Sequence, residues 1–262
     1  MIEDRGFTGN LRSRIRLGSA LTASLCAVAM VLAVVAAGCG SDNGTSSPPS
    51  SHFSFSTNGQ GLWVANGTNV LEFAGPYKSR TPNTAPAITL SNTSGFTSTQ
   101  GVQFDSAGNL WVVDGGDTTA TPAGTHAASL NKFTQAQLSP GGTLNLTPNV
   151  ALTSTALTFP QQAVFDTEGN LWVTNNVLPT NNAGVLMFTP AQLTAGGAQT
   201  PFGALENATF TGPLGLAFDT TGNLWVANNG GTTIFEFSAA NIAIVRAGGG
   251  HAVAPSITLS TT

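Results

Sequence analysis

The sequence predicts an all-β fold, a β-propeller built from four four-stranded repeats. The first observation behind this prediction is an eleven-residue motif, FDSAGNLWVVD at 104–114, that returns as FDTEGNLWVTN at 165–175 and FDTTGNLWVAN at 218–228, with a degenerate copy at 55–66. The second is that all four tryptophans lie inside these copies, at spacings of 48, 61 and 53 residues. Periods near 50 residues are typical of propeller blades, and the periodicity of helical repeats is absent.

Each repeat contains four short segments that alternate with turn residues. The repeats are predicted at approximately 53–91, 101–153, 162–206 and 215–260. We name their strands a to d. Strand b carries the LWV core of the motif and is apolar on both faces, as in a sheet that is covered on both sides. Strand d is clearest as ITLS in the first and last repeats and is weakest in the third, near Phe202–Leu205.

The turn between strands a and b explains the repeated motif. In D-x-x-G-N an aspartate can accept hydrogen bonds from the backbone of the turn, and glycine takes the positive φ that other residues resist. Asp105, Asp166 and Asp219 are therefore predicted to cap turns rather than to take part in chemistry, and Ser56 suits the same role in the first repeat. The tryptophan that follows is predicted to be buried between blades.

The N-terminal residues are typical of an export signal. Four arginines precede an uncharged run rich in Ala, Val and Leu from Leu17 to Ala37, which ends in AAGCGS. This ending resembles the lipobox of bacterial lipoproteins, which implies a signal peptide at 1–38 and lipidation of Cys39, with residues 39–52 as a Ser/Pro-rich linker. An uncleaved transmembrane helix is the alternative. Both interpretations place the remaining chain outside the cytoplasm, lipid-anchored to the cell membrane or envelope in the first case.

Charge and cysteine content narrow the function classes. Only 8% of residues are charged and the net charge is −4, so the basic face of a nucleic-acid-binding protein is not expected. Of the two cysteines, Cys26 lies in the predicted signal and Cys39 at its end. The folded part therefore has no cysteine for a disulfide or a thiolate metal site, and its stability must come from its core.

The repeats with GVQFDSAGNLWVVD and GLAFDTTGNLWVANNGGTTIFEF resemble NHL-type propeller repeats and their relatives, the gluconolactonase/regucalcin-like and streptogramin-lyase-like propellers. The resemblance covers residues 53–260. Such relatives usually have about six blades, and here there are four. The chain is therefore expected to form either a closed four-bladed ring, which is favoured, or a partial propeller. Open strand edges would favour self-association.

One face of the propeller is the better candidate for function. In an up-and-down blade, the b–c and d–a connections lie on one face and the a–b and c–d connections on the other. The b–c loops vary in length, with insertions at 115–129 and 176–184, which favours a binding face, although neutral variation of surface loops is the alternative. On the opposite face, 134–142 and 189–197 each predict one helical turn, capped by threonine and ended by glycine.

Polar residues at the ends of strand b and before strand a are the candidate binding residues: Asn66, Gln100, Asp114, Gln161, Asn175 and Asn228. In the gluconolactonase-like propellers an Asn and an Asp at similar positions hold a divalent metal. Here Asp114 is the one carboxylate of the set, with Asp117 nearby, so both are weak metal candidates. Plain hydrogen bonding at strand ends is the alternative. No cofactor is expected beyond such a cation, and no catalytic residue is assigned.

The sequence therefore predicts a lipid-anchored, extracytoplasmic β-propeller that serves as a binding or scaffolding module for an unidentified ligand or protein. The alternative is a metal-dependent lactonase or lyase of the gluconolactonase/streptogramin-lyase type. A lyase would require a placed histidine base as well as a metal, and His126, in a Gly/Thr-rich loop, is a poor candidate for that base.

Overall fold

The computed structural model describes residues 53–55, 61–74, 85–117, 126–176, 184–207 and 209–260, the first of these segments by its backbone alone. The predicted signal peptide (1–38), lipidation site Cys39 and linker (39–52) lie outside these residues. Within the described segments, no helix is both long enough and apolar enough to cross a membrane.

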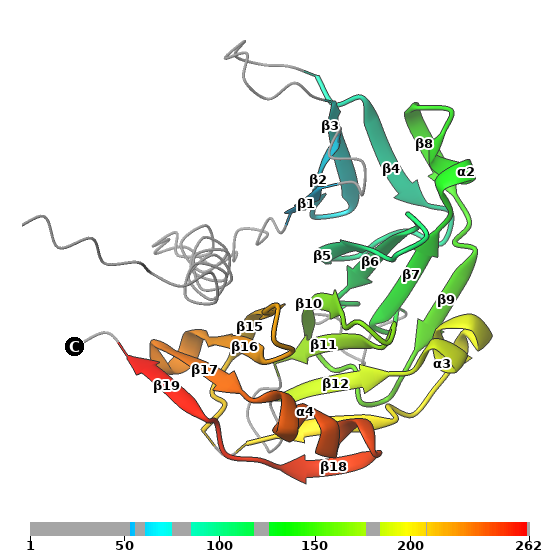
Figure 1. The fold of residues 1–262 in the computed structure, drawn as a ribbon. Helices are drawn as coiled ribbons and strands as arrows, with labels where there is room; N and C mark the ends of the chain where they lie inside the picture. The colour runs from blue at the N-terminus through cyan, green and yellow to red at the C-terminus, as the bar shows by residue number, and fades with distance from the viewer. Residues whose placement is uncertain are drawn as a thin grey trace, which may run out of the picture.

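Four antiparallel sheets form the blades and confirm the predicted fold class (Figure 1). In each sheet strands a, b, c and d lie in order, with neighbouring strands hydrogen-bonded. The strand d predicted near Phe202–Leu205 in the third repeat is confirmed and is β14. In chain order the strands are β1 (Phe53–Phe55), β2 (Gly61–Asn66), β3 (Asn69–Ala74) and β4 (Ile88–Asn92) in blade 1; β5 (Thr99–Phe104), β6 (Leu110–Asp114), β7 (Ser129–Phe133) and β9 (Val150–Thr153) in blade 2; β10 (Pro160–Phe165), β11 (Leu171–Asn175), β12 (Gly184–Phe188) and β14 (Gly203–Glu206) in blade 3; and β15 (Pro213–Phe218), β16 (Leu224–Asn228), β17 (Thr233–Phe237) and β19 (Ile257–Ser260) in blade 4.

The a–b turns are built as predicted, and the structure also explains the Asn and Trp of the motif. In blade 3, Asp166 Oδ1 accepts hydrogen bonds from the backbone N–H groups of Glu168 and Asn170, both at 2.9 Å. Asp166 Oδ2 accepts from Asn170 Nδ2 at 2.9 Å and from Trp172 Nε1 at 2.8 Å. Gly169 has a φ of 83°. One carboxylate thus holds the turn and orients the tryptophan, and Asp105 and Asp219 repeat these contacts.

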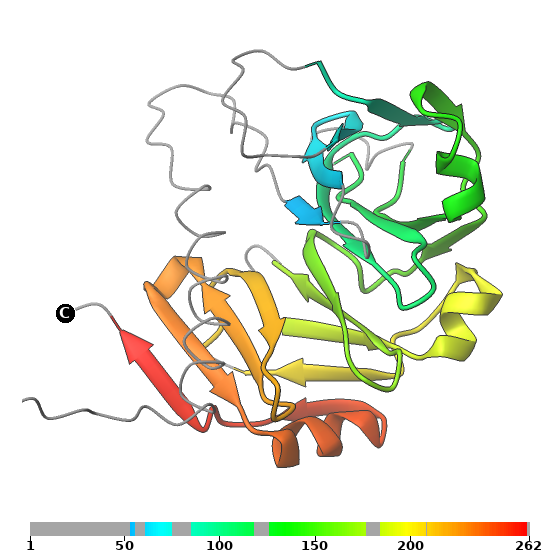
Figure 2. The same cartoon turned by 45° about the horizontal axis from the view of Figure 1, so that its top comes forward.

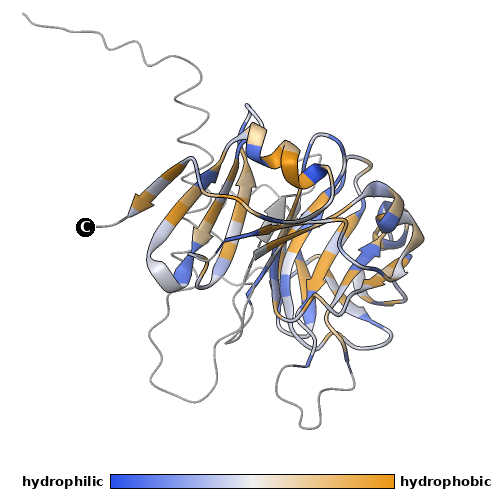
Figure 3. Ribbon diagram, turned by 90° about the horizontal axis from the view of Figure 1, so that it is seen from below, coloured by the Kyte–Doolittle hydropathy of each residue, from blue (hydrophilic) through white to orange (hydrophobic). Residues whose placement is uncertain are grey.

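All four tryptophans are buried, as predicted, and the first three pack between blades. Their exposed fractions are 3% for Trp63, 3% for Trp111, 0% for Trp172 and 5% for Trp225. The first three each meet, edge to face, the phenylalanine that ends strand a of the next blade, with ring centroids 5.8–6.2 Å apart; the pairs are Trp63–Phe104, Trp111–Phe165 and Trp172–Phe218. The core is therefore a series of apolar layers between successive sheets, and the loops are more hydrophilic (Figure 3).

The c–d connections of blades 2, 3 and 4 each carry a capped helix, which confirms the two predicted helical turns and adds a longer third helix. They are α2 (Gln135–Leu138), α3 (Pro190–Ala195) and α4 (Ala239–Arg246). Each begins with a Ser or Thr N-cap in a reciprocal capping box, which satisfies backbone N–H groups at the helix start. Helix α4 was not predicted from the sequence, although its Ser238 cap and the glycines after it follow the same pattern as the other two.

After each helix the chain adds a short strand to the blade before its own. These strands are β8 (Gly142–Leu146), β13 (Gly197–Ala198) and β18 (Gly249–Ala252), which pair in parallel with β4, β9 and β14 respectively. Glycines with positive φ, such as Gly141 and Gly142, make the turn out of the helix possible. Blades 2, 3 and 4 are thus each hydrogen-bonded to the preceding blade at its outer edge, in addition to packing against it through the core.

The four sheets form an open arc, so the favoured prediction of a closed four-bladed ring is wrong (Figures 1 and 2). Strand β1 pairs with β2, and β19 pairs with β17, but the two terminal strands do not pair with each other. The last sheet does not meet the first, and the described part of the chain is a partial propeller.

Candidate functional site

The polar side chains at the ends of three b strands accept hydrogen bonds from the loops that precede strand a. Asp114, Asn175 and Asn228 are buried, with exposed fractions of 2–3%. Each accepts hydrogen bonds from two successive backbone N–H groups that lie 17 and 16 residues earlier in the chain. The donors are Thr97 and Ser98 for Asp114, Thr158 and Phe159 for Asn175, and Thr211 and Gly212 for Asn228, at 2.9–3.3 Å.

The remaining polar atoms of these three residues are also used by the chain. Asn175 Nδ2 donates to the Ala156 carbonyl oxygen at 2.9 Å, and Asn228 Nδ2 donates to the Thr209 carbonyl oxygen at 3.2 Å. Asp114 has no side-chain donor and accepts a further hydrogen bond from Thr97 Oγ1 at 3.1 Å. This geometry is the end-of-strand hydrogen bonding that the sequence analysis set beside the metal site, and it makes the d–a loops well-anchored parts of this face.

Two further candidates, Asn66 for binding and Asp117 for a metal, do not take part in these hydrogen bonds. Asn66 is exposed at the end of β2, opposite Asn69. Asp117 follows β6, and its backbone N–H donates to the His126 carbonyl oxygen at 3.0 Å. In the segments that the structure describes, no group of three or more His, Cys, Asp or Glu side chains is placed to hold a metal ion.

The two glutamines before strand a differ in their hydrogen bonds. Gln100 is 7% exposed, and its Nε2 donates to Ser98 Oγ at 2.6 Å. Gln161 is 3% exposed, and its Nε2 has no hydrogen-bond partner among the described residues. The position that corresponds to Ser98 is Phe159, which has no side-chain acceptor. A buried donor at the start of β10 is thus left unsatisfied because of one change between the repeats.

A second unsatisfied atom lies beside the same blade. Asn176 follows the last residue of β11, and its backbone N–H donates to the Phe159 carbonyl oxygen at 2.9 Å. Its Oδ1 is buried and accepts no hydrogen bond from the part of the chain that the structure describes. Buried polar atoms are rarely left without partners, so a buried donor and a buried acceptor at one end of blade 3 require an explanation.

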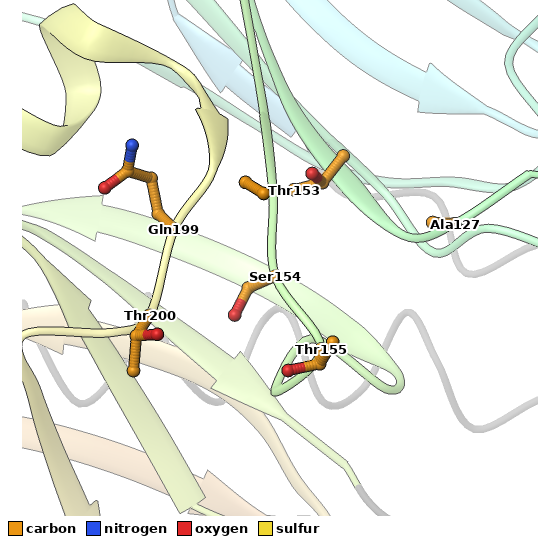
Figure 4. Close-up of a pocket in the computed structure, with 7 residues that line it drawn as sticks. Ala127, Thr153, Ser154, Thr155, Gln199 and Thr200 are labelled. Atoms are coloured by element: carbon orange, nitrogen blue, oxygen red, sulfur yellow. The ribbon is translucent and has the colours of Figure 1, made fainter.

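A groove of about 340 Å³ lies at the outer side of this face, between blades 2 and 3 (Figure 4). Its lining contains hydroxyl, amide and methyl groups and no ionisable side chain. The lining residues are Ala127, Thr153, Ser154, Thr155, Ala198, Gln199 and Thr200. The loop at 154–159 begins in the groove and ends next to Gln161, and Asn175 clamps it in between. The groove and the unsatisfied atoms therefore lie along one anchored loop.

The carboxylates of the a–b turns lie on the opposite face, one to a blade, as predicted. Burial alone would raise the pKa of Asp166, but hydrogen bonds from Asn170 and Trp172 and the nearby Arg246 outweigh it, so the pKa is lowered. The same balance of burial against hydrogen bonds lowers the pKa values of Asp105 and Asp219. These aspartates are held ionised as structural acceptors, far from the pKa that a general acid would need.

Sequence reasoning missed Asn176 and the residues of the groove. The one available signal for Asn176 was the Asn-Asn pair after strand b, which occurs in repeats three and four. The groove gave no signal, because Thr, Ser and Gln are common throughout this chain and β13, which brings Gln199 to the groove, is a two-residue strand.

Comparison with known proteins shows the fold and no more. No family model matches the sequence, and no curated protein matches it. Among solved structures, hydrazine synthase from Kuenenia stuttgartiensis is 14% identical with a TM-score of 0.51, over 75% of this chain and 55% of that chain. Virginiamycin B lyase from Staphylococcus aureus is 14% identical with a TM-score of 0.40, over 72% and 52%.

A calcium structure of a Trichoderma reesei carbohydrate-active enzyme of family AA12 is 13% identical with a TM-score of 0.46, over 69% of this chain and 65% of that one. The chain thus spans little more than half the length of the first structures it matches. The propeller fold that the repeats indicated is confirmed by the four sheets of the structure, and lyases of streptogramin B and virginiamycin B are among the solved structures that the chain resembles. The chain is a four-bladed β-propeller arc.

Proposed function

We propose that this chain is a lipid-anchored, extracytoplasmic binding module that takes a neutral polar ligand at the end of blade 3. The observation that carries the proposal is the pair of buried, unsatisfied atoms, Gln161 Nε2 and Asn176 Oδ1. One is a donor and the other an acceptor. A ligand with hydroxyl or amide groups can satisfy both.

The energetics favour a ligand at this position. An unsatisfied buried polar group costs about 1–3 kcal/mol, and a bound ligand that completes its hydrogen bond removes that cost. The loop at 154–159, held by Asn175, is already ordered, so little conformational entropy is lost when the ligand binds. The groove at the other end of this loop has no ionisable lining residue, which favours an uncharged ligand that extends along the loop.

The anchor rests on the sequence. An arginine-rich start, an uncharged run from Leu17 to Ala37 and the AAGC ending favour export and lipidation of Cys39. The lowered pKa values of Asp105, Asp166 and Asp219 and their structural contacts make these three turn aspartates unsuited to general acid catalysis. Binding, rather than catalysis, is the function that the described polar groups support.

Replacing Gln161 by leucine is expected to weaken ligand binding by a factor of about 2 to 12, because one hydrogen bond of about 0.5–1.5 kcal/mol is lost. The free protein should keep its stability, since the substitution removes an unsatisfied buried donor. The measurement is thermal unfolding with a panel of neutral oligosaccharides and uncharged peptides, where a ligand at a hundred times its Kd adds about 2.7 kcal/mol.

The matched control is Gln103→Leu, a partly buried glutamine of β5 whose Nε2 donates to the Phe104 carbonyl oxygen at 3.3 Å, near the opposite end of the strand. It should leave ligand binding unchanged. If Gln103→Leu and Gln161→Leu weaken binding equally, or if no compound of the panel stabilises the wild-type protein, the proposed site is wrong.

Replacing Cys39 by alanine is expected to abolish incorporation of a labelled fatty acid into the protein, because this thiol is the proposed attachment point. The measurement is metabolic labelling of growing cells with an alkyne fatty acid, followed by purification and detection of the label. Cys26→Ala is the control and should label like the wild-type protein. Equal labelling of the Cys39→Ala protein would refute the anchor.

A further inference from the structure

A short loop of blade 4 lies against the acceptor of the proposed site, Asn176 Oδ1. A Cβ atom at Gly212, which directly precedes β15, would lie 3.8 Å from this oxygen, 3.7 Å from Asn176 Nδ2 and 3.2 Å from the backbone nitrogen of Gly230. Asn176, Gly212 and the b–c connection of blade 4 therefore meet between blades 3 and 4. We call residues 229–232 of this connection the blade 4 loop; it begins with the 3₁₀ helix η1 (Asn229–Gly231).

The blade 4 loop packs closely against the loop that precedes β15. The backbone N–H of Asn229 donates to the Gly212 carbonyl oxygen at 2.8 Å. A Cβ atom at Gly230 would lie 2.6 Å from the Thr211 carbonyl oxygen and 2.7 Å from Thr211 Oγ1, which is closer than a Cβ atom approaches other atoms in proteins. Glycine at position 230 thus permits this arrangement, in which the two backbones touch with no side chain between them.

Thr232 ends the blade 4 loop in a strained backbone conformation. Its φ of 49° and ψ of 36° lie in the left-handed region, and no other described residue except glycine has a positive φ. A β-branched residue rarely adopts this region. Thr232 is also exposed, so burial of its side chain does not hold it there. The loop therefore stores strain in its present position, and a movement of the loop can release it.

An equivalent hydrogen bond in blade 2 supplies an internal reference. The backbone N–H of Gly115 donates to the Ser98 carbonyl oxygen at 2.8 Å, in the place of the hydrogen bond from Asn229 to Gly212. The next residue, Gly116, has a φ of 71°, which glycine adopts freely. The two blades thus close the same contact, and the strained threonine occurs only in blade 4 among the described residues.

We propose that the blade 4 loop is a gate over the ligand site, closed in this structure. Because Asn176 Oδ1 is buried, a neighbouring segment must move before a ligand can bind to it. The blade 4 loop is a neighbour that is exposed and strained, and it is held to the adjacent loop by a hydrogen bond between backbones. Local opening of such segments costs less than global unfolding.

This inference rests on the proposed function and adds the regulation of the same site. If only molecules with an open loop bind the ligand, the apparent Kd equals the intrinsic Kd divided by the open fraction. A change that favours the closed loop therefore weakens binding, and a change that favours the open loop strengthens it.

The gate can be tested without a ligand. Thr232→Asn is expected to favour the closed loop, because asparagine adopts the left-handed region more readily than threonine. In NMR measurements of hydrogen exchange on the full-length protein in a mild detergent, it should slow exchange of the Asn229 amide about fivefold. In the wild-type protein the Asn229 amide should be less protected than the Gly115 amide. Equal protection of the two amides, or unchanged exchange in Thr232→Asn, would overturn the gate.

The matched control is Thr68→Asn. Thr68 lies in the b–c turn of blade 1 and is exposed like Thr232, but its φ is not positive. The same substitution should therefore leave exchange of the Asn229 amide at the wild-type rate. A slowing equal to that of Thr232→Asn would show that the effect does not come from the strained backbone, and would refute the proposal.

Ligand binding separates failure of the gate from failure of the site. With any compound of the panel that stabilises the wild-type protein, Thr232→Asn should raise Kd by the factor by which it slows exchange. Gly230→Ala, whose Cβ atom would collide with Thr211 in the closed loop, should lower Kd. If a compound binds and neither variant changes Kd, the gate is wrong and the ligand site stands. If no compound binds the wild-type protein, the ligand site is wrong and the gate falls with it.

Discussion

Replacing Trp172 by alanine is expected to lower the free energy of unfolding by about 3–5 kcal/mol. Trp172 is 0% exposed and meets Phe218 of the next blade at a centroid distance of 5.8 Å. Its indole N–H also donates to Asp166 Oδ2 at 2.8 Å. The substitution therefore opens a cavity between blades 3 and 4 and removes an aromatic pair. It also removes one of the donors to Asp166 Oδ2. Urea denaturation followed by circular dichroism measures the loss.

The matched control is Phe202→Ala. Phe202 is also a large aromatic residue, but it is 45% exposed. Its replacement should change the free energy of unfolding by no more than about 0.5 kcal/mol, as for most surface substitutions. Equal losses for Phe202→Ala and Trp172→Ala would contradict the conclusion that stability resides in the layers between blades.

The features that could be predicted from the sequence are those that each repeat specifies within itself. The a–b turn needs an acceptor, a residue that takes positive φ and a large apolar group within eleven residues, and all three are visible in FDTEGNLWVTN. Because the requirement is local and recurs in every blade, the sequence repeats it, and the number of strands in each blade follows from the spacing of the copies.

The features that could not be predicted depend on contacts between repeats. Strand β8 alternates Leu144 and Leu146 with exposed polar residues, but the blade that it joins is the preceding one, which its own repeat does not specify. Strand β13 also pairs with the preceding blade and has only two residues. The openness of the arc depends on the angle between sheets, which no single repeat encodes.

The candidate site also combines a feature that could be predicted from the sequence with one that could not. The loop lengths predict the b–c and d–a face as the binding face, and this stays a prediction. The different states of Gln100 and Gln161 became visible only when the structure placed Ser98 and Phe159 at equivalent positions beside them.

Replacing Asp166 by alanine is expected to lower the free energy of unfolding by about 1–3 kcal/mol, the usual result when buried hydrogen-bond donors lose their acceptor. The Asp166 side chain is 1% exposed, and its Oδ2 lies 3.0 Å from Arg246 Nη2, an ion pair that joins blade 3 to α4 of blade 4. Alanine would leave the Trp172 indole N–H and the Asn170 side chain without their acceptor. Urea denaturation at pH 7 measures the loss.

The control is Asp219→Ala, in which the same turn hydrogen bonds are lost. Within the described residues Asp219 forms no ion pair, and it lies near the carboxylate of Glu236, so its removal should cost less than that of Asp166.

The pH dependence of the stability of Asp166→Ala gives a second readout. Because the pKa of Asp166 is lowered in the folded protein, its contribution is complete above the unfolded value of about 3.9 and disappears as the pH falls through the lower folded value. The difference between wild type and Asp166→Ala should therefore shrink between pH 4 and pH 2. A difference that stays constant over this range would mean that the ionised carboxylate does not stabilise the fold.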